Sequence, residues 1–113
     1  MSSAREEELT EDRFLDAVSA IRFLAPDLSP IGGAILAAIN FGVAKDSRSF
    51  SNRLGVEHAL ALREVTALSS PELGLLEVLD RNERTQKTAF ALTTKGADLV
   101  SRALETNQQP PKR

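Results

Sequence analysis

The chain has 113 residues, of which 42% are hydrophobic and 27% charged, with a formal net charge of -2 and no cysteine. This length fits one compact domain with a buried core, and the composition is that of neither a disordered nor a fibrous protein. The absence of cysteine excludes disulfides, thiolate metal sites and cysteine nucleophiles, and the slightly negative total gives the whole chain no general attraction to nucleic acid.

The N-terminal segment and the longest apolar run carry no signal for export or for a membrane span. The chain starts with MSSAREEELTEDR, which is acidic where a secretory signal peptide is basic and then apolar. The longest apolar run, residues 31–44, falls short of the roughly 20 residues of a transmembrane helix and predicts a buried helix instead. We therefore expect a cytoplasmic protein whose residues 1–9 form a disordered acidic N-terminus.

The first helix is expected to begin after Thr10. A threonine followed by two acidic residues is typical of a helix start, because its side-chain oxygen accepts a backbone N–H and the acids interact favourably with the helix dipole. Apolar residues then recur at helical spacing over residues 14–24, and Pro26 ends the pattern. Leu15 and Phe23 lie outside that stripe, which predicts contacts on a second side of the helix, such as with a partner subunit.

A second helix is predicted from Ser29 and Pro30 to about Phe41. Serine is a favoured N-cap, and proline suits the first helical position because its missing N–H would have no partner there. The segment is apolar nearly all round, which is typical of a central core helix.

Two short helices joined by a glycine turn are predicted next. Asp46-Ser47 predicts a cap, and residues 49–54 predict a short helix that ends at Gly55, a residue suited to a left-handed turn. Residues 57–68 predict the second helix of the pair. Its inward row is expected to be Ala61, Val65 and Leu68.

After Gly74 the apolar period changes from helical to alternating, which predicts two β-strands joined as a hairpin. The residues expected on their shared inward face are Leu76, Val78, Thr88, Phe90 and Leu92. Three basic residues are expected to cluster at the hairpin tip: Arg81, Arg84 and Lys87. Thr93 predicts the cap of a last helix that runs to about Leu104. The fold prediction is one mostly α domain with a β-hairpin over residues 10–106, followed by a disordered tail over residues 107–113.

Helices followed by a two-stranded hairpin occur in this order in a winged helix-turn-helix. Three parts of the sequence, Ser47–Leu68, the basic-tipped hairpin and LTTKGADLV (Leu92–Val100), resemble the multiple-antibiotic-resistance-regulator (MarR) family of bacterial transcription factors. The resemblance covers roughly Ser29 to Leu104. It implies a bacterial regulator with a winged helix-turn-helix fold, in which extra N-terminal and C-terminal helices make a homodimer.

The resemblance also implies which residues contact DNA. In the family the second helix of the motif enters the major groove, and the wing places an arginine in or near the minor groove. The groove-facing positions that match here are His58, Ala59, Leu62, Arg63 and Thr66. The wing arginine would be Arg84, and Ser47 and Arg48 match positions that touch phosphate.

The charges support DNA contacts only locally. Between Lys45 and Lys95 the chain has eight basic and seven acidic residues, one positive charge net. Affinity for DNA leans heavily on phosphate contacts, for which the candidates are Arg48, Arg53, Arg81, Arg84 and Lys87. The Arg63 side chain can pair with guanine, and the side chain of Ala59 or Leu62 can pack on a thymine methyl group. We therefore expect modest affinity with a shallow salt dependence.

Several of these residues also have plainer interpretations. His58, the only histidine, is a base contact, a pH sensor or simply a residue of the helix surface. The arginines and lysine of the hairpin are by default solubilising charges on a sheet edge. No metal site is expected, because neither a second histidine nor a cysteine accompanies His58. No cofactor and no enzyme class are expected either, because a single histidine without a nucleophile motif offers no general-base arrangement.

Two functions remain open from the sequence. The first is a homodimeric DNA-binding transcriptional regulator whose two reading helices lie roughly 34 to 36 Å apart on a near-palindromic site. Thr10–Leu24 and Thr93–Leu104 are the expected dimer helices, with room for a small apolar effector between them and the core. The alternative is a degenerate winged-helix protein–protein interaction module without sequence-specific DNA binding, which the apolar stretch around Leu60 favours.

Overall fold

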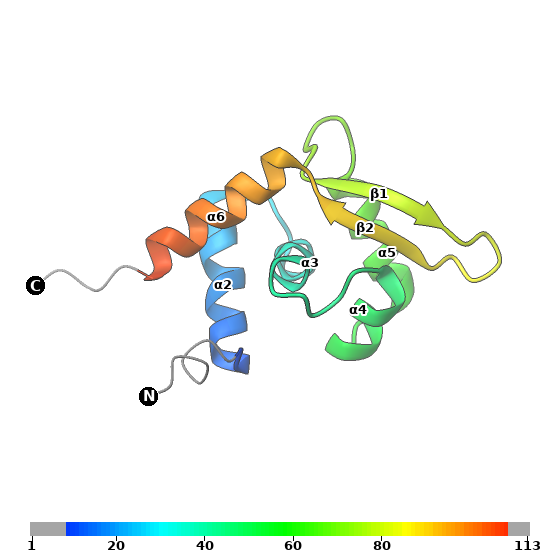
Figure 1. Cartoon of the computed structure of the whole chain (residues 1–113), viewed down its shortest axis with the longest axis horizontal. Coiled ribbons are helices and arrows are strands. Elements are labelled where there is room, and N and C mark those ends of the chain that lie inside the picture. Colours follow the sequence, from blue (N-terminus) through cyan, green and yellow to red (C-terminus); the bar gives the residue numbers. More distant parts are fainter. Residues whose placement is uncertain (1–8, 109–113) are drawn as a thin grey trace, which may run out of the picture.

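The computed structural model describes residues 9–108, which form five helices and one two-stranded antiparallel hairpin (Figure 1). In chain order the elements are α2 (Glu11–Leu24), α3 (Pro30–Asn40), α4 (Ser47–Leu54), α5 (His58–Leu68), β1 (Leu76–Arg81), β2 (Thr88–Leu92) and α6 (Thr94–Gln108). The predicted fold class is confirmed: mostly α with a β-hairpin, consistent with a winged helix-turn-helix that has an extra helix at each end. Within residues 9–108, no helix has the length and apolar character needed to span a membrane.

The last helix is longer than predicted. Helix α6 continues to Gln108, two residues past the domain boundary expected at 106. The polar residues there continue the helix, and the nearest strong helix breaker in the sequence is Pro110. Of the disordered N-terminus expected over residues 1–9 only Leu9 belongs to the described residues, and the rest of the expected tail, residues 109–113, lies outside them.

The predicted caps start the helices. The side-chain oxygens of Thr10, Ser29 and Asp46 accept backbone N–H groups three residues on, at 3.1, 2.9 and 2.8 Å. Each satisfies one of the backbone donors that a helix start leaves without a partner. Helix α4 begins directly after Asp46, two residues before the start expected at Ser49.

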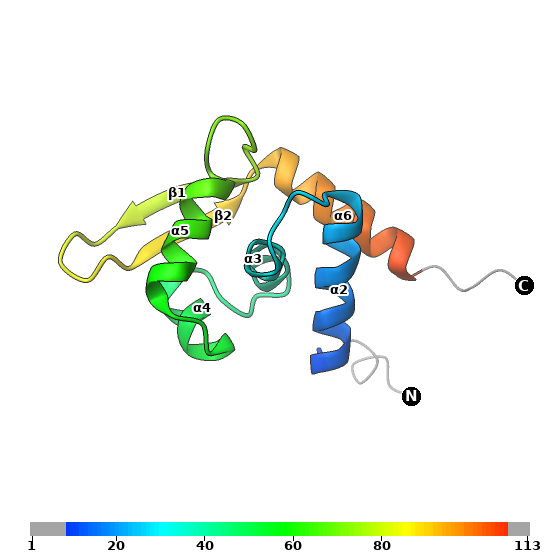
Figure 2. The ribbon, with the colours of Figure 1, turned by 180° about the vertical axis from the view of Figure 1, so that it is seen from behind.

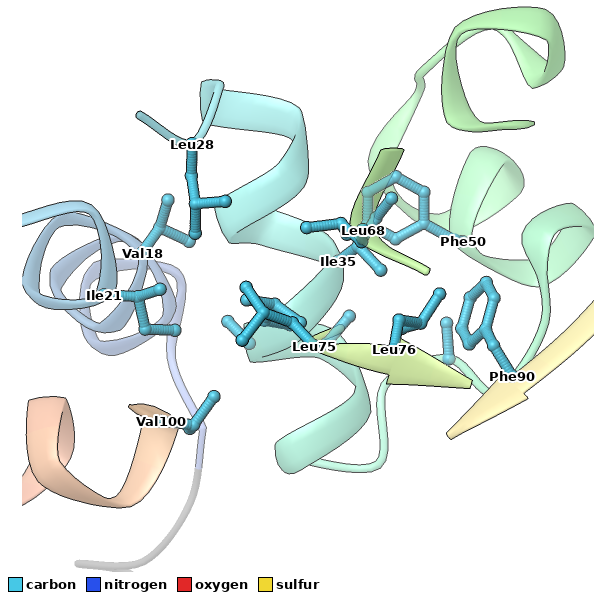
Figure 3. Packing of buried hydrophobic residues seen from close by; sticks show 14 of the residues in the cluster. Val18, Ile21, Leu28, Ile35, Phe50, Leu68, Leu75, Leu76, Phe90 and Val100 are labelled. Atoms are coloured by element: carbon cyan, nitrogen blue, oxygen red, sulfur yellow. The ribbon is translucent and has the colours of Figure 1, made fainter. Parts of the chain in front are cut away.

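Helix α3 is the central element of the core, as predicted. Figure 1 shows it end-on, with α2 and α6 on one side and α4, α5 and the hairpin on the other, and Figure 2 shows the same arrangement from behind. Ile35 of α3 is fully buried between the two sides. Figure 3 shows Ile21 and Val100 on one side of it and Phe50 and Phe90 on the other. One apolar cluster therefore joins both ends of the molecule.

The two strands of the hairpin pair with one irregularity. Leu76 lies opposite Leu92 and Val78 opposite Phe90, so these residues share a face as predicted, although Val78 is 38% exposed. Beyond Val78 the register shifts, and Leu79 is left without a partner. This β-bulge places Arg81 opposite Thr88.

The start of α6 is locked against the end of the loop before β1. The Thr93 hydroxyl donates to the Gly74 carbonyl at 2.7 Å and accepts the Gly96 N–H at 2.9 Å, so Thr93 caps α6 as predicted. A side chain at Gly96 would collide with the backbone carbonyl of Leu75. The Leu-Thr-x-x-Gly stretch therefore carries a structural requirement: a capping threonine and a glycine that lets two backbone segments meet.

Candidate nucleic-acid interface

Helices α4 and α5 form the predicted helix pair. Gly55 has a φ of 68° and its N–H bonds to the Ser51 carbonyl, which is the left-handed turn that glycine adopts without a steric penalty. The inward row of α5 is the predicted one, because Ala61, Val65 and Leu68 are all buried. The remaining side chains of α5 are therefore those available to a partner.

The outward surface of α5 carries little charge. Ala59, Arg63 and Thr66 are exposed, and Leu62 is half-buried beside them. Their spacing puts these four of the five predicted groove-facing residues on one face of the helix. The fifth, His58, is hydrogen-bonded to Ser47. The Thr66 hydroxyl donates to the Leu62 carbonyl at 3.1 Å, and Arg63 is the only lysine or arginine in the helix. A base-reading role on this face would depend mainly on Arg63.

Ser47 does not lie where the sequence placed it. The residue has 0% exposure, and its Oγ lies 2.9 Å from the Thr88 backbone nitrogen and 2.8 Å from Nε2 of His58. A buried hydroxyl with both of these partners cannot reach a DNA phosphate, so the predicted direct contact is wrong for this side chain. Ser47 instead joins α4 to β2 and to the first residue of α5. The sequence showed a polar helix start but not that strand β2 covers it.

His58 is half-buried at this junction, and its surroundings favour the neutral imidazole. Burial lowers the pKa of His58 below its ordinary 6.5, the Arg48 guanidinium lowers it further, and Asp46 partly opposes both. Burial alone would raise the pKa of Asp46, but the Ser49 backbone N–H and hydroxyl, Lys87 and the Arg48 N–H together lower it. The Asp46 carboxylate is therefore charged at neutral pH and His58 is not.

The hairpin loop is fixed both internally and to α4. Asn82 Oδ1 accepts the backbone N–H groups of Arg84 and Thr85 at 2.9 and 3.0 Å, which is the turn that asparagine favours. Arg48 donates from a terminal guanidinium nitrogen to the Thr85 carbonyl at 3.0 Å. Arg48, expected to touch phosphate, thus also holds the loop, and its guanidinium has further donors for an anion.

The three predicted basic residues of the hairpin have different surroundings. Arg84 is exposed in the loop, as expected of a wing arginine. Arg81 donates from Nε to the Thr88 hydroxyl at 3.2 Å, a position that follows from the bulge at Leu79. Lys87 lies near the Asp46 carboxylate and lowers its pKa. Of these three basic side chains, only that of Arg84 has neither a hydrogen bond nor a neighbouring charge that shifts a pKa within residues 9–108.

Sequence reasoning missed three residues that organise this surface. Asn82 and Thr85 shape the loop, and Thr88 receives the Arg81 bond and gives its N–H to Ser47. An asparagine at the start of a polar turn is a recognisable signal for Asn82. Thr88 had no such signal, because its partner Ser47 is 41 residues away in the chain.

A separate apolar hollow of about 550 Å³ lies between α2, the start of α3 and the turn from α4 to α5. Phe14, Val18 and Leu54 are among its apolar lining residues, and Arg53 is its basic member. A small apolar effector was expected from the sequence between the flanking helices and the core, and this hollow lies beside one of those helices, α2. The ligand itself stays a prediction.

The residues near the helix pair do not form a metal or hydrolytic site. Within residues 9–108 no group of three histidine, cysteine or carboxylate side chains is placed to hold a metal ion. Ser47 and His58 resemble a nucleophile beside its base, but Ser47 is fully buried and its Oγ accepts the Thr88 N–H. A substrate cannot meet this hydroxyl.

No family model, no curated protein and no solved structure matches this chain. The likeness to the MarR family therefore stays a prediction from the residues quoted above. The fold and the surface chemistry of α4, α5 and the hairpin are what support a function.

Proposed function

We propose that the chain is a DNA-binding transcriptional regulator that acts as a homodimer and reads a near-palindromic site. One observation carries the proposal: α4 holds both the wing and the reading helix through side-chain hydrogen bonds, while Arg63 and Arg84 remain exposed. Helix α5 would read bases in the major groove, and the hairpin loop would bring Arg84 to the minor groove.

The fixed wing supports the proposal energetically. A loop that is already ordered by Asn82, Thr85 and Arg48 loses little conformational freedom on binding, so more of its contact energy appears as affinity. The same end of the molecule carries α4, α5 and the hairpin, away from α2 and α6 (Figures 1 and 2). Helices α2 and α6 are thereby left for the second subunit.

A salt titration with an arginine variant and a matched control tests DNA binding. Labelled mixed-sequence genomic DNA is titrated with the wild type, Arg84→Ala and Arg102→Ala at low and at physiological salt. Arg102 is an exposed arginine on α6, outside the helix pair and the hairpin, and is paired with Asp98 at 3.2 Å. Because α6 is a proposed dimer helix, Arg102→Ala serves as the control once sedimentation shows that it associates like the wild type. We expect salt-sensitive binding by the wild type and by Arg102→Ala. In Arg84→Ala the slope of log affinity against log salt should shrink by about one per subunit.

Two outcomes would count against this function. Absence of binding at low salt by a folded wild-type protein would eliminate DNA as the partner of the free chain. Equal weakening by Arg84→Ala and Arg102→Ala would reduce the interaction to general charge attraction without a role for the wing.

The rival function is a winged-helix protein–protein interaction module without sequence-specific DNA binding. Leu60, exposed on α5, and the nearly balanced charge of the central segment favour it. A photo-crosslinking residue at position 60 separates the two functions in cells: capture of DNA supports the regulator, and capture of protein alone supports the module.

A further inference from the structure

The Ser47 hydroxyl joins three elements, and its one proton determines how it can do so. Oγ of Ser47 lies 2.9 Å from the Thr88 nitrogen and 2.8 Å from Nε2 of His58. The Thr88 N–H can only donate, so Oγ accepts there. Within residues 9–108, Nε2 is then the one remaining partner for the hydroxyl proton. This donor count makes Nε2 an acceptor and puts the proton of the neutral imidazole on Nδ1.

Protonation of His58 would leave one hydrogen-bond donor at this junction without an acceptor. Ser47 and Thr88 both have 0% exposure, so no solvent can replace a lost partner. If His58 gains a proton, Nε2–H and Thr88 N–H both point at Oγ, and the Ser47 hydroxyl proton has no acceptor. An unpaired buried hydroxyl is costly. His58 is only half-buried, so its imidazolium can turn toward solvent. The Ser47 hydroxyl then still lacks an acceptor, so protonation of His58 breaks this bond in either position.

The charged groups around His58 act in the same direction on balance. Asp46 and Arg48 face it from the start of α4, and Lys87 comes from the hairpin loop beside Asp46. On its own element the nearest acid is Glu57, which is exposed and makes no side-chain cap for α5. Burial and Arg48 lower the pKa of His58, and Asp46 offsets part of this effect. The neutral state is therefore the one that this junction is built for.

We propose that His58 is a positioning residue of the DNA-binding surface: its neutral imidazole accepts the Ser47 hydroxyl and keeps the wing joined to the reading helix, and its protonation uncouples them. Burial and Arg48 hold the pKa of His58 below its ordinary 6.5, so the coupling is present at neutral pH and is lost as the pH falls through the folded-state pKa. The effect on DNA rests on the proposed function, whereas the effect on the junction does not.

The junction is tested first on the free, full-length protein by nuclear magnetic resonance. His58 is the only histidine, so its ring nitrogens give one set of signals whose shifts identify the tautomer. We expect the Nδ1–H tautomer at pH 8. The Thr88 amide should change its shift and exchange faster with the same midpoint as His58, below pH 6.5. An Nε2–H tautomer, or a Thr88 amide that ignores the titration of His58, would overturn the proposal.

The effect on DNA is tested with a variant that keeps the acceptor and removes the titration. In His58→Gln the side-chain amide oxygen can occupy the place of Nε2 and accept the Ser47 hydroxyl at every pH. His58→Leu removes the acceptor and should resemble the acid form of the wild type. Between pH 7.5 and an acid pH at which nuclear magnetic resonance shows His58 protonated, we expect the affinity of the wild type to fall about tenfold relative to His58→Gln, in line with a buried hydroxyl that loses its partner.

The opposite outcomes are informative in different ways. Tighter binding of the wild type than of His58→Gln at the acid pH would mean that the imidazolium contacts phosphate, and the positioning role would be rejected. If neither protein binds DNA at any pH, the proposed function fails, while the tautomer and the Thr88 titration still decide whether His58 holds the junction.

Discussion

The two ends of the molecule are held together in different ways. At the end with α4, α5 and the hairpin, hydrogen bonds from Ser47 and Arg48 set the positions of three elements. At the other end α2 and α6 meet mainly through apolar packing, and Phe23 is left 82% exposed. Directional bonds fix the geometry of a surface, whereas apolar packing tolerates many partners of similar shape. Under the proposed function, the first end would recognise DNA and the second would form the dimer.

The largest effect is expected where the two ends meet, at the start of α6. Gly96→Ala would drive a methyl group into the Leu75 carbonyl, which is backbone and cannot turn aside. We expect the free energy of unfolding to fall by about 3 kcal/mol, the upper range for overpacking. Urea unfolding measures it. Ala97→Gly, at an exposed position in the same turn, is the control and should cost about 1 kcal/mol or less. Equal losses would show that the close contact does not matter.

The next effect separates a bonded hydroxyl from an unbonded one on the same helix. Ser47→Ala leaves the Thr88 N–H buried without an acceptor, so the free energy of unfolding should fall by about 2 kcal/mol. Ser51 is also buried, but its Oγ has no hydrogen-bond partner among the described residues. Ser51→Ala should therefore be neutral or slightly stabilising, because it removes a polar group that burial leaves unsatisfied. If Ser47→Ala and Ser51→Ala change the free energy of unfolding equally, Ser47 does not hold the junction.

The helices and strands could be predicted because the sequence patterns that specify them are local. The capping side chains of Thr10, Ser29 and Asp46 bond to backbone groups three residues away, and each apolar row repeats at the spacing of its own element. A single sequence contains all of that information. Two helix boundaries differ from the prediction: α4 begins at Ser47 instead of Ser49, and α6 continues to Gln108. The second difference arose because polar residues were taken to end a helix that has no breaker before Pro110.

The interface was less predictable because its organising contacts span the chain. Ser47 and Thr88 are 41 residues apart, and Arg48 reaches Thr85 across 37. No local pattern reveals that a strand will cover a helix start. The bulge at Leu79 gave no signal either, because it contains no glycine, and yet it decides which way Arg81 faces.

The smallest effect on unfolding, and the largest on association, is expected at the apolar end. Phe23→Ser removes an aromatic side chain that is almost fully exposed, so the monomer should unfold with nearly unchanged free energy. In a symmetric dimer through α2 and α6, Phe23 of each subunit would be buried. Phe23→Ser would then remove about 1.5 to 3 kcal/mol of burial free energy at each copy and weaken the dimer about 100-fold or more. Analytical ultracentrifugation at a series of concentrations measures the dimer dissociation constant.

The matched control for that measurement lies at the other end of the molecule. Leu79 is 58% exposed on the hairpin, away from α2 and α6, so Leu79→Ser should leave association unchanged. A wild type that stays monomeric at high micromolar concentration would contradict the dimer itself. If Leu79→Ser and not Phe23→Ser weakens self-association, the dimer interface lies on the hairpin. Dimerisation would then compete with DNA binding, and the roles proposed for the two ends would be wrong.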